Sequence, residues 1–207
     1  MEEWQAIALL KSGDLNGLEM LVHQYYFQAV RASFLIVQDI HQAEDIVQAS
    51  FLHASDKAEQ LSSDRFGPWF LKMVVNASIR AARKQKRQIS LGEQEDCRFL
   101  MEWLTDPRPS IEEIIETEEV RQKVWKALTL LPVRQRAAVV LKYYLEMSEK
   151  EVSRELRSPV SSVKWLLFSA RKKLKTSLRS INDPHLSGVD HSVDCACDQQ
   201  EKEYSDE

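Results

Sequence analysis

Apolar residues recur at intervals of three and four positions along most of this chain, which is the spacing of amphipathic α-helices. In the N-terminal half, the spacing predicts one helix that follows Asp14 and can extend to Val37, and a second that opens at Asp39. Aspartate is a favoured N-cap residue, so both aspartates suit these positions. A third helix is predicted from Pro68 to about Arg87, with proline in the first turn, where it is well tolerated.

The same spacing continues in the C-terminal half. One helix is predicted after Ser110 and stops before Pro132, and another runs from Pro132 to Leu145. Ser148 and Glu151 have the spacing of a capping box, which starts a further helix. The chain of 207 residues contains only five Gly and six Pro, which argues against a many-stranded sheet. The sequence therefore predicts an all-α protein, and it contains no internal repeat.

The segment from Ser148 to Lys175 predicts two helices separated at Ser158-Pro159. Ser158 can cap the second helix and Pro159 can take its first position. The apolar positions of the two helices form an inward stripe: Val152, Leu156, Val163, Leu167, Ala170 and Leu174. The second helix presents an outward face of polar, cationic and aromatic side chains: Ser161, Ser162, Lys164, Trp165, Phe168, Arg171 and Lys172. This pattern is typical of a DNA-reading helix-turn-helix, and an amphipathic hairpin with solvated charges is the alternative.

Length, cysteine content and hydropathy narrow the class of protein. A chain of 207 residues predicts one or two domains. Cysteine occurs only at positions 97, 195 and 197, too few for a disulfide framework, so a reducing, cytoplasmic setting is expected. No apolar run approaches the ~20 residues of a membrane-spanning helix. The N-terminus is acidic where a signal peptide would be basic, so no membrane insertion is predicted.

Charge is segregated along the chain, although the net charge is only −4. Residues 71–90 and 164–179 each contain six basic residues and no acidic residue. The segment from Glu93 to Glu119 contains ten acids, and the tail from Asp183 to Glu207 contains eight. Two basic segments separated by an acidic connector indicate a protein that grips one polyanion at two places. The alternative is that the basic residues only complement helix C-termini.

The body of the chain lacks the motifs of catalysis. It contains no Gly-rich phosphate loop, nucleophile motif or clustered metal ligands, so neither an enzyme nor a cofactor is predicted. The tail contains four residue types that bind zinc or copper: His185, His191, Cys195 and Cys197. Their Cys-x-Cys spacing is tighter than that of structural zinc sites. The favoured interpretation is a disordered acidic tail without metal, which screens the basic helix just before it.

Three segments, in this order, resemble extracytoplasmic-function (ECF) sigma factors, a subfamily of the sigma-70 family of RNA polymerase sigma factors. The segment AEDIVQASF (Ala43–Phe51) resembles their polymerase-binding helix. The segment FGPWFLKMVVNASIRAARKQKR (Phe66–Arg87) resembles their promoter-melting helix, and residues 128–174 resemble their helix-turn-helix domain. The resemblance covers roughly residues 1–180 and implies a protein that binds core polymerase and directs promoter-specific initiation.

The resemblance also implies a domain organisation and a set of partners. Residues 1–90 would form sigma region 2, which binds core polymerase and the minus-ten element, and residues 111–180 would form region 4, which binds the minus-thirty-five element. A flexible linker would span 91–110, and 181–207 would form the acidic tail. The implied partners are the β′ and β subunits of core RNA polymerase, promoter DNA and, as is common in the family, an anti-sigma factor.

Residues at matching positions give the implied sites. The polymerase-binding face would contain Glu44, Asp45 and Gln48. The minus-ten element would contact one loop and the following helix: Ser62, Ser63, Asp64, Arg65, Asn76, Arg80, Arg83 and Lys84. The minus-thirty-five element would contact the outward face of the second hairpin helix. Trp69 and Phe70 are open to either core packing or base stacking.

The chain departs from the family pattern at some DNA-facing positions. Phe168-Ser169 stands where the family often has a basic residue, and Arg80 stands where it often has aspartate. These departures concern which promoter is read rather than the type of activity. A stand-alone helix-turn-helix regulator is the second interpretation, although it leaves Glu44, Asp45 and the first basic segment unexplained.

Overall fold

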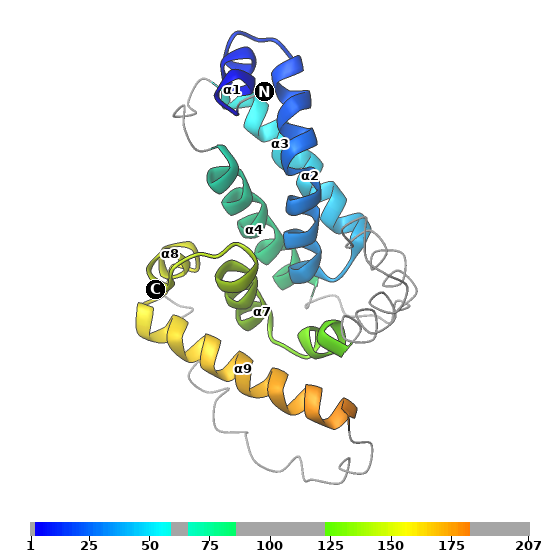
Figure 1. Cartoon of the computed structure of the whole chain (residues 1–207), viewed down its shortest axis with the longest axis vertical. Coiled ribbons are helices and arrows are strands. Elements are labelled where there is room, and N and C mark those ends of the chain that lie inside the picture. The colour runs from blue at the N-terminus through cyan, green and yellow to red at the C-terminus, as the bar shows by residue number, and fades with distance from the viewer. Residues whose placement is uncertain (1–2, 59–65, 86–122, 183–207) are drawn as a thin grey trace, which may run out of the picture.

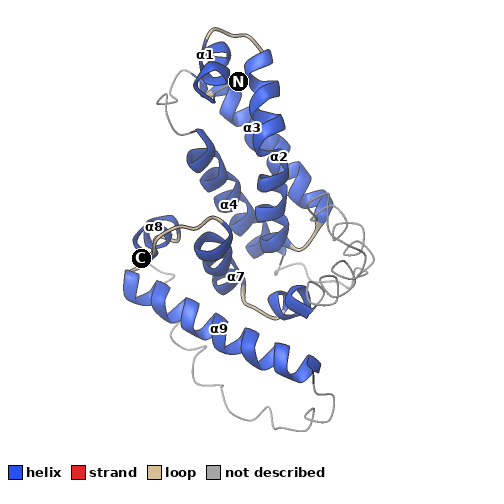
Figure 2. Cartoon of the chain, in the orientation of Figure 1, coloured by secondary structure: helices blue, strands red, loops and turns tan. Residues whose placement is uncertain are grey.

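The structure is a computed structural model that describes residues 3–58, 66–85 and 123–182. All regular structure in these ranges is helical, which confirms the predicted all-α class (Figure 2). The elements labelled in Figure 1 follow the chain in this order: α1 (Glu3–Lys11), α2 (Asn16–Val37), α3 (Ile40–Asp56), α4 (Phe66–Gln85), α7 (Val133–Val139), the π-helical turn η3 (Val140–Tyr144), α8 (Glu149–Glu155) and α9 (Val160–Asn182). Residues 123–129 are also helical. None of the described helices has the length and apolar character needed to cross a membrane.

The N-terminal helices begin close to their predicted starts. Asp39 is the N-cap of α3, and its carboxylate accepts a hydrogen bond from a backbone amide of the first turn at 2.9 Å. Asp14 accepts a hydrogen bond from the Asn16 amide at 2.9 Å, although α2 itself begins at Asn16. Helix α4 begins at Phe66, two residues earlier than expected, so Pro68 lies within its first turn. The cap at Asp39 and the proline in the first turn of α4 are therefore confirmed, whereas the predicted cap at Asp14 is wrong, because the N-cap of α2 is Leu15 and it makes no side-chain cap hydrogen bond.

The start of α4 is anchored to α1 and α2. The Glu3 carboxylate accepts hydrogen bonds from the Phe66 amide, at 2.8 Å, and from the Tyr25 hydroxyl. Burial, together with the hydrogen bond to Glu3, raises the pKa of Tyr25. Phe70 is fully buried, with its ring centroid 4.2 Å from that of Phe51 and 5.2 Å from that of Phe66. Of its two predicted roles, Phe70 therefore has the core-packing one.

The C-terminal helices follow the predicted pattern with one irregularity. The helix predicted after Pro132 is α7, which continues into the π-helical turn η3, a feature that apolar periodicity does not reveal. The capping box of α8 is confirmed, since Glu151 Oε2 accepts from the Ser148 amide at 2.8 Å and Ser148 Oγ accepts from the Glu151 amide at 3.3 Å. The hydrogen bonds from Ser148 lower the pKa of the Glu151 carboxyl. Val163 and Leu167 are buried, as the inward stripe predicts.

The predicted cap of the last helix is wrong. The Pro159 carbonyl accepts the first hydrogen bond of α9, so the helix begins one residue later than expected. The Ser158 hydroxyl points elsewhere, because it donates to the Leu156 carbonyl at 3.0 Å and accepts from the Arg134 guanidinium. Ser158 therefore ties the turn to α7 instead of capping α9.

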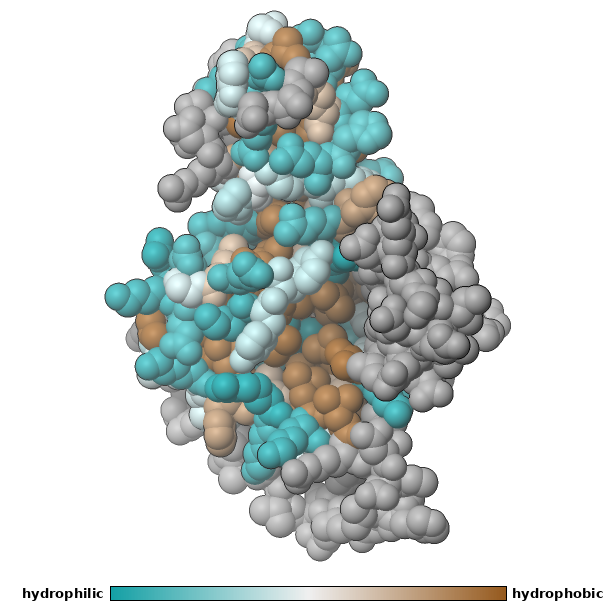
Figure 3. All heavy atoms as spheres, in the orientation of Figure 1, coloured by the Kyte–Doolittle hydropathy of each residue, from teal (hydrophilic) through white to brown (hydrophobic). Residues whose placement is uncertain are grey.

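Helices α1–α4 and α7–α9 form two groups, which agrees with the expected two-domain layout, and the groups also pack on each other (Figure 1). One core cluster contains Phe34 and Val75 of the first group together with Leu141 and Val152 of the second. The Phe34 ring stacks on Trp125, with ring centroids 4.4 Å apart and planes 3° apart. On the face shown in Figure 3, apolar atoms gather down the middle of the molecule. The two helix groups thus pack against each other in the described part of the chain. The hydrophobic pattern of the sequence did not predict this packing.

The remaining sequence predictions fall outside the described ranges. The linker predicted at 91–110 is not described, nor is the tail from residue 183 onward. The helix predicted after Ser110 is described only from residue 123.

Candidate nucleic-acid and partner interfaces

The outward face of α9 is exposed from Ser161 to Lys172. All seven residues predicted for it are exposed: Ser161, Ser162, Lys164, Trp165, Phe168, Arg171 and Lys172. Trp165 is 51% exposed and Phe168 63%. The opposite face packs on the core through Val163, Leu167 and Ala170. One side of α9 is therefore buried while the other presents serine hydroxyls, cations and two aromatic rings to solvent.

Contacts from α7 and α8 fix the position of α9. The Arg134 guanidinium donates to Ser158 Oγ just before the helix, and Gln135 Nε2 donates to Ser169 Oγ at 3.2 Å in its middle. Lys164 Nζ lies 4.0 Å from Glu149 Oε2 on α8, and both groups are partly exposed, so this pair adds little stability. The two hydrogen bonds from α7 thus hold the start and the middle of α9 against the rest of the second helix group.

Helix α4 carries the first basic segment. Arg80 and Lys84 are exposed, and Arg83 is exposed at the same end of the helix. Asn76 lies between α4 and α8 and is only partly exposed. The structure therefore brings the predicted cations of α4 to the surface but does not leave Asn76 free beside them. The other predicted minus-ten residues, Ser62, Ser63, Asp64 and Arg65, lie outside the described residues.

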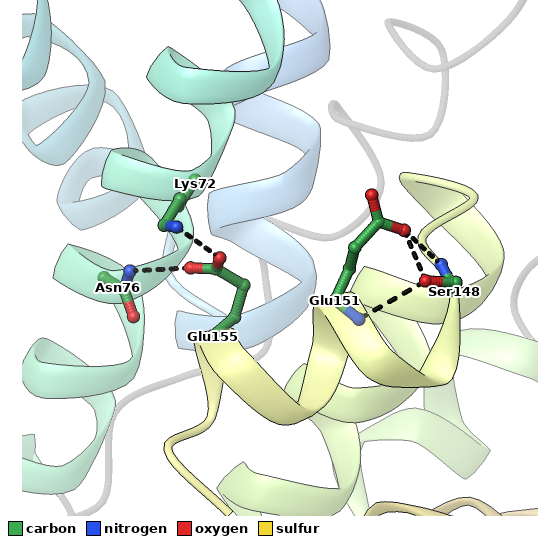
Figure 4. Close-up of polar contacts among 5 residues, drawn as sticks. All are labelled: Lys72, Asn76, Ser148, Glu151 and Glu155. Atoms are coloured by element: carbon green, nitrogen blue, oxygen red, sulfur yellow. Dashed lines mark hydrogen bonds and ion pairs between the residues drawn. The ribbon is translucent and has the colours of Figure 1, made fainter. Parts of the chain in front are cut away.

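A carboxylate of α8 occupies the side of α4 on which Asn76 lies (Figure 4). Lys72 Nζ is 2.5 Å from Glu155 Oε1, and Asn76 Nδ2 donates to Glu155 Oε2 at 3.4 Å. The Glu155 side chain is only 8% exposed, whereas that of Lys72 is 50% exposed. Nothing in the local sequence pattern indicates a role for Glu155, because its contact with Asn76 spans 79 positions of the chain.

The predicted polymerase-binding residues lie on α3. Asp45 and Gln48 are exposed and Glu44 is partly exposed, while the buried Val47 anchors the other side of the helix. Glu44 lies close enough to Tyr26 to contribute, after burial, to the raised pKa of that phenol. Helix α3 thus presents two carboxylates and an amide within two turns, a set that suits basic partner side chains.

Two further residues belong to the core rather than to a surface. Trp69 is half-buried, with its ring centroid 5.9 Å from that of Phe66, and it packs against a second core cluster, within the N-terminal helices, that contains Phe51, Phe66 and Phe70. The Arg136 side chain of α7 is buried, and its Nη1 donates to the Leu131 carbonyl at 3.4 Å. Burial lowers the pKa of Arg136 to about 10. The sequence pattern around Arg136, a charged residue near a predicted helix start, does not indicate that its side chain is buried.

The described ranges contain no group of three or more His, Cys, Asp or Glu side chains placed to hold a metal ion. The candidate ligands His185, His191, Cys195 and Cys197 lie outside those ranges. The described surfaces of interest are therefore two helix faces with exposed cations, on α4 and α9, and one with exposed or partly exposed acids, on α3.

Comparison with known families matches both halves of the chain. Residues 21–88 match the model of sigma-70 region 2, and residues 121–174 match the model of sigma-70 region 4. The first match contains α3, α4 and most of α2, and the second contains α7, η3, α8 and most of α9. The two matched segments thus carry all the described candidate residues.

Individual relatives agree with these models along most of the chain. The ECF RNA polymerase sigma factor SigW of Bacillus subtilis (strain 168) is 26% identical over 183 residues, covering 84% of this chain and 96% of the relative. SigM of the same strain is also 26% identical, covering 78% of this chain and 96% of that protein. The solved structure of CnrH in complex with the cytosolic domain of CnrY shares the fold, with a TM-score of 0.57, 20% identity and coverage of 86% of this chain and 97% of that one. The chain therefore belongs to the ECF group of the sigma-70 family and is a sigma factor that directs transcription initiation rather than an enzyme.

Proposed function

We propose that this sigma factor binds core RNA polymerase through Glu44, Asp45 and Gln48 of α3, and promoter DNA through α4 and α9. In this proposal residues 1–90 act as region 2 and residues 111–180 as region 4, with β′ and β as the polymerase partners. The protein works where its polymerase does, in the cytoplasm. Each interface is assigned residue by residue from the family resemblance and from the exposure of the described side chains.

The exposure of α9 is the observation that carries this proposal furthest. Seven polar, cationic or aromatic residues share its outward face, and none of them is buried. Arginine and lysine suit phosphates, serine suits either phosphates or base edges, and an aromatic ring can pack on a thymine methyl. Trp165 and Phe168 place two exposed aromatic rings on the same face as these cations, a combination that suits nucleic acid.

Holoenzyme formation tests the polymerase assignment. The double variant Glu44→Lys/Asp45→Lys reverses the charge of the proposed face and should abolish co-elution with purified core polymerase in gel filtration. Circular dichroism should stay unchanged, because both side chains lie at or near the surface. A matched control, Glu19→Lys/Asp56→Lys, reverses two exposed acids elsewhere and should bind like the wild type. Native affinity of the Glu44/Asp45 variant would overturn the assignment.

The same experiment separates the sigma factor from a stand-alone helix-turn-helix regulator, which would not co-elute with polymerase at all. An anti-sigma factor is a further part of the proposal. It is supported by the family resemblance and by the fold shared with CnrH, whose structure is that of a complex with the cytosolic domain of CnrY.

A further inference from the structure

The turn between α8 and α9 holds an arginine in the left-handed backbone region (Figure 1). Arg157 has a φ of 47°. Its amide donates to the Arg154 carbonyl at 3.3 Å, and the Ser158 amide donates to the Ser153 carbonyl at 3.0 Å. These two bonds form a Schellman motif, in which the left-handed position is usually glycine because a Cβ is strained there. Arginine therefore occupies a position that glycine would occupy at a lower free energy.

Hydrogen bonds on both sides of Arg157 fix this conformation. Ser153 Oγ donates to the Ser158 carbonyl at 2.6 Å, and the Arg134 guanidinium donates to Ser158 Oγ. A strained residue persists where the surrounding structure determines its backbone, and such residues gather at functional sites. The Arg157 side chain is therefore a candidate for a role outside the fold itself.

Comparison with similar positions shows what is particular to Arg157. Among the residues that the structure describes, three non-glycine residues have a positive φ: Gln38, Glu146 and Arg157, with values of 66°, 54° and 47°. All three lie at the ends of helices. Strain alone therefore does not distinguish Arg157. Its charge and its place do, because it is the basic residue of the three and lies three positions before Val160, where α9 begins.

The leading turns of α9 carry little positive charge of their own. Between residues 161 and 170, Lys164 is the only basic residue, and its Nζ lies 4.0 Å from Glu149 Oε2. A helix that enters the major groove N-terminus first needs cations for the phosphates beside those turns. Arg157 is exposed, and no carboxylate of the described residues forms an ion pair with it. Its guanidinium is therefore available where the helix itself is short of charge.

We propose that Arg157 is a further DNA-contacting residue, whose guanidinium binds a backbone phosphate beside the leading end of α9. A guanidinium matches the geometry of a phosphate with two parallel hydrogen bonds. Phosphate contacts fix the register of a protein on the duplex and carry no sequence information directly. Arg157 therefore adds affinity and positions α9 without selecting a base. This inference rests on the proposed role of α9 in DNA binding.

Two measurements on the full chain with Arg157→Gly test the proposal. In anisotropy titrations with a short fluorescein-labelled duplex of mixed sequence, the variant should bind several-fold more weakly at low salt. Its salt-dependence slope should fall by about one unit. Its thermal unfolding midpoint should rise by about 2–4 °C, because glycine relieves the strained conformation. Weaker binding by a more stable protein is a combination that a purely structural role does not produce.

Three control variants separate backbone, charge and side chain. Gln38→Gly relieves strain at another helix end without a change of charge, so it should raise the midpoint and keep the slope. Lys11→Gln removes an exposed cation on α1 and should keep the slope as well. Arg157→Lys keeps the cation and the strain, so it should retain most of the affinity with no rise in the midpoint. An equal loss of slope in Lys11→Gln and Arg157→Gly would overturn the contact, since general charge would then explain both.

The remaining outcomes distinguish this inference from the proposed function. If Arg157→Gly loses helical signal in circular dichroism, Arg157→Asn decides, because asparagine tolerates the left-handed region and is uncharged. A folded glycine or asparagine variant with an unchanged slope would overturn the contact at Arg157, and a lowered midpoint in Arg157→Gly would overturn the conformational argument. Lys172→Ala in the same titration tests α9 separately. A slope reduced by Lys172→Ala alone would leave the proposed role of α9 standing, whereas two unchanged slopes would contradict both.

Discussion

Helices α9 and α4 are both candidate DNA surfaces, yet the closed chain leaves one free and covers part of the other. Every predicted residue on the outward face of α9 is exposed. On α4, Asn76 is partly buried and donates its amide to Glu155, whereas Arg80 and Lys84 remain exposed. The difference arises because α8 packs beside the middle of α4 but behind the outward face of α9.

This difference shows that similar charge patterns in sequence do not imply equal readiness to bind. The two basic segments, residues 71–90 and 164–179, each contain six basic residues and are alike in sequence. In the folded chain, α9 exposes all seven of its predicted contact residues, whereas on α4 Asn76 is engaged by Glu155. Mutations on α4 and α9 can therefore be compared, to distinguish a DNA-binding surface that is already exposed from one that is partly covered in the free chain.

The largest expected effect is the difference in stability between a substitution on the buried face of α9 and one on its exposed face. Leu167 is 2% exposed within the shared core, so Leu167→Ala should lower the free energy of unfolding by about 2–5 kcal/mol. Trp165 is 51% exposed, and Trp165→Ala should change it by less than about 0.5 kcal/mol. Urea denaturation monitored by circular dichroism measures both values. Comparable losses would mean that Trp165 is part of the core rather than of a free surface.

The next effect concerns which DNA is preferred. If α9 enters the major groove N-terminus first, as proposed, Trp165 and Phe168 are expected nearer the base edges than the cations further along the helix. Trp165→Arg should therefore change promoter preference, by about 1–3 kcal/mol of discrimination at a contacted base pair. Selection from a randomised minus-thirty-five duplex by the holoenzyme measures this change. The same preferred sequence for variant and wild type would count against the placement of Trp165.

A smaller effect is expected from single phosphate contacts. Lys172→Ala and Lys84→Ala should each weaken DNA binding similarly for all sequences and reduce the salt-dependence slope by about one unit. Lys72→Ala should leave the slope of the free chain nearly unchanged, because its charge is already paired with Glu155. Lys11→Ala, at an exposed cation on α1, is the control. Fluorescence anisotropy titrations over a series of salt concentrations give the slopes, and a full-unit loss for Lys72→Ala would contradict the closed arrangement.

The smallest effect is expected from the acidic tail. Its eight acids and single base follow closely after α9, and a tether this short keeps their effective concentration high. Truncation after Asn182 should strengthen DNA binding modestly at low salt, with a gain that fades as salt screens the charges. Equal affinities of the full and truncated chains at low ionic strength would remove the screening hypothesis. A stoichiometric metal lost on truncation would favour the sensor interpretation of the tail instead.

Local signals in the sequence predicted most of the fold. The cap at Asp39, the capping box of Ser148 and Glu151, and the inward stripe of α9 all depend on residues within a few positions of each other. Such short-range chemistry can be read without knowing the tertiary structure. The wrong cap at Ser158 shows the limit, because a guanidinium from α7 competes for the same hydroxyl.

The contacts between the two helix groups could not be predicted in the same way. The stacking of Phe34 on Trp125 and the pairing of Lys72 with Glu155 join residues that are far apart in the chain. An apolar residue on a helix face shows that something covers it, but not which element does. Glu155 also looks like an ordinary solvated acid in a helix of mixed charge, so its burial is a purely tertiary property.

In vitro transcription with purified core polymerase on genomic fragments tests the central claim most directly. The wild-type chain should produce discrete transcripts that start at a common promoter sequence. Glu44→Lys/Asp45→Lys should produce none, and Trp165→Arg should shift the set of promoters used. Transcripts that are independent of the added chain, or an unchanged promoter set and yield for both variants, would contradict the assignment of α3 to polymerase and α9 to DNA.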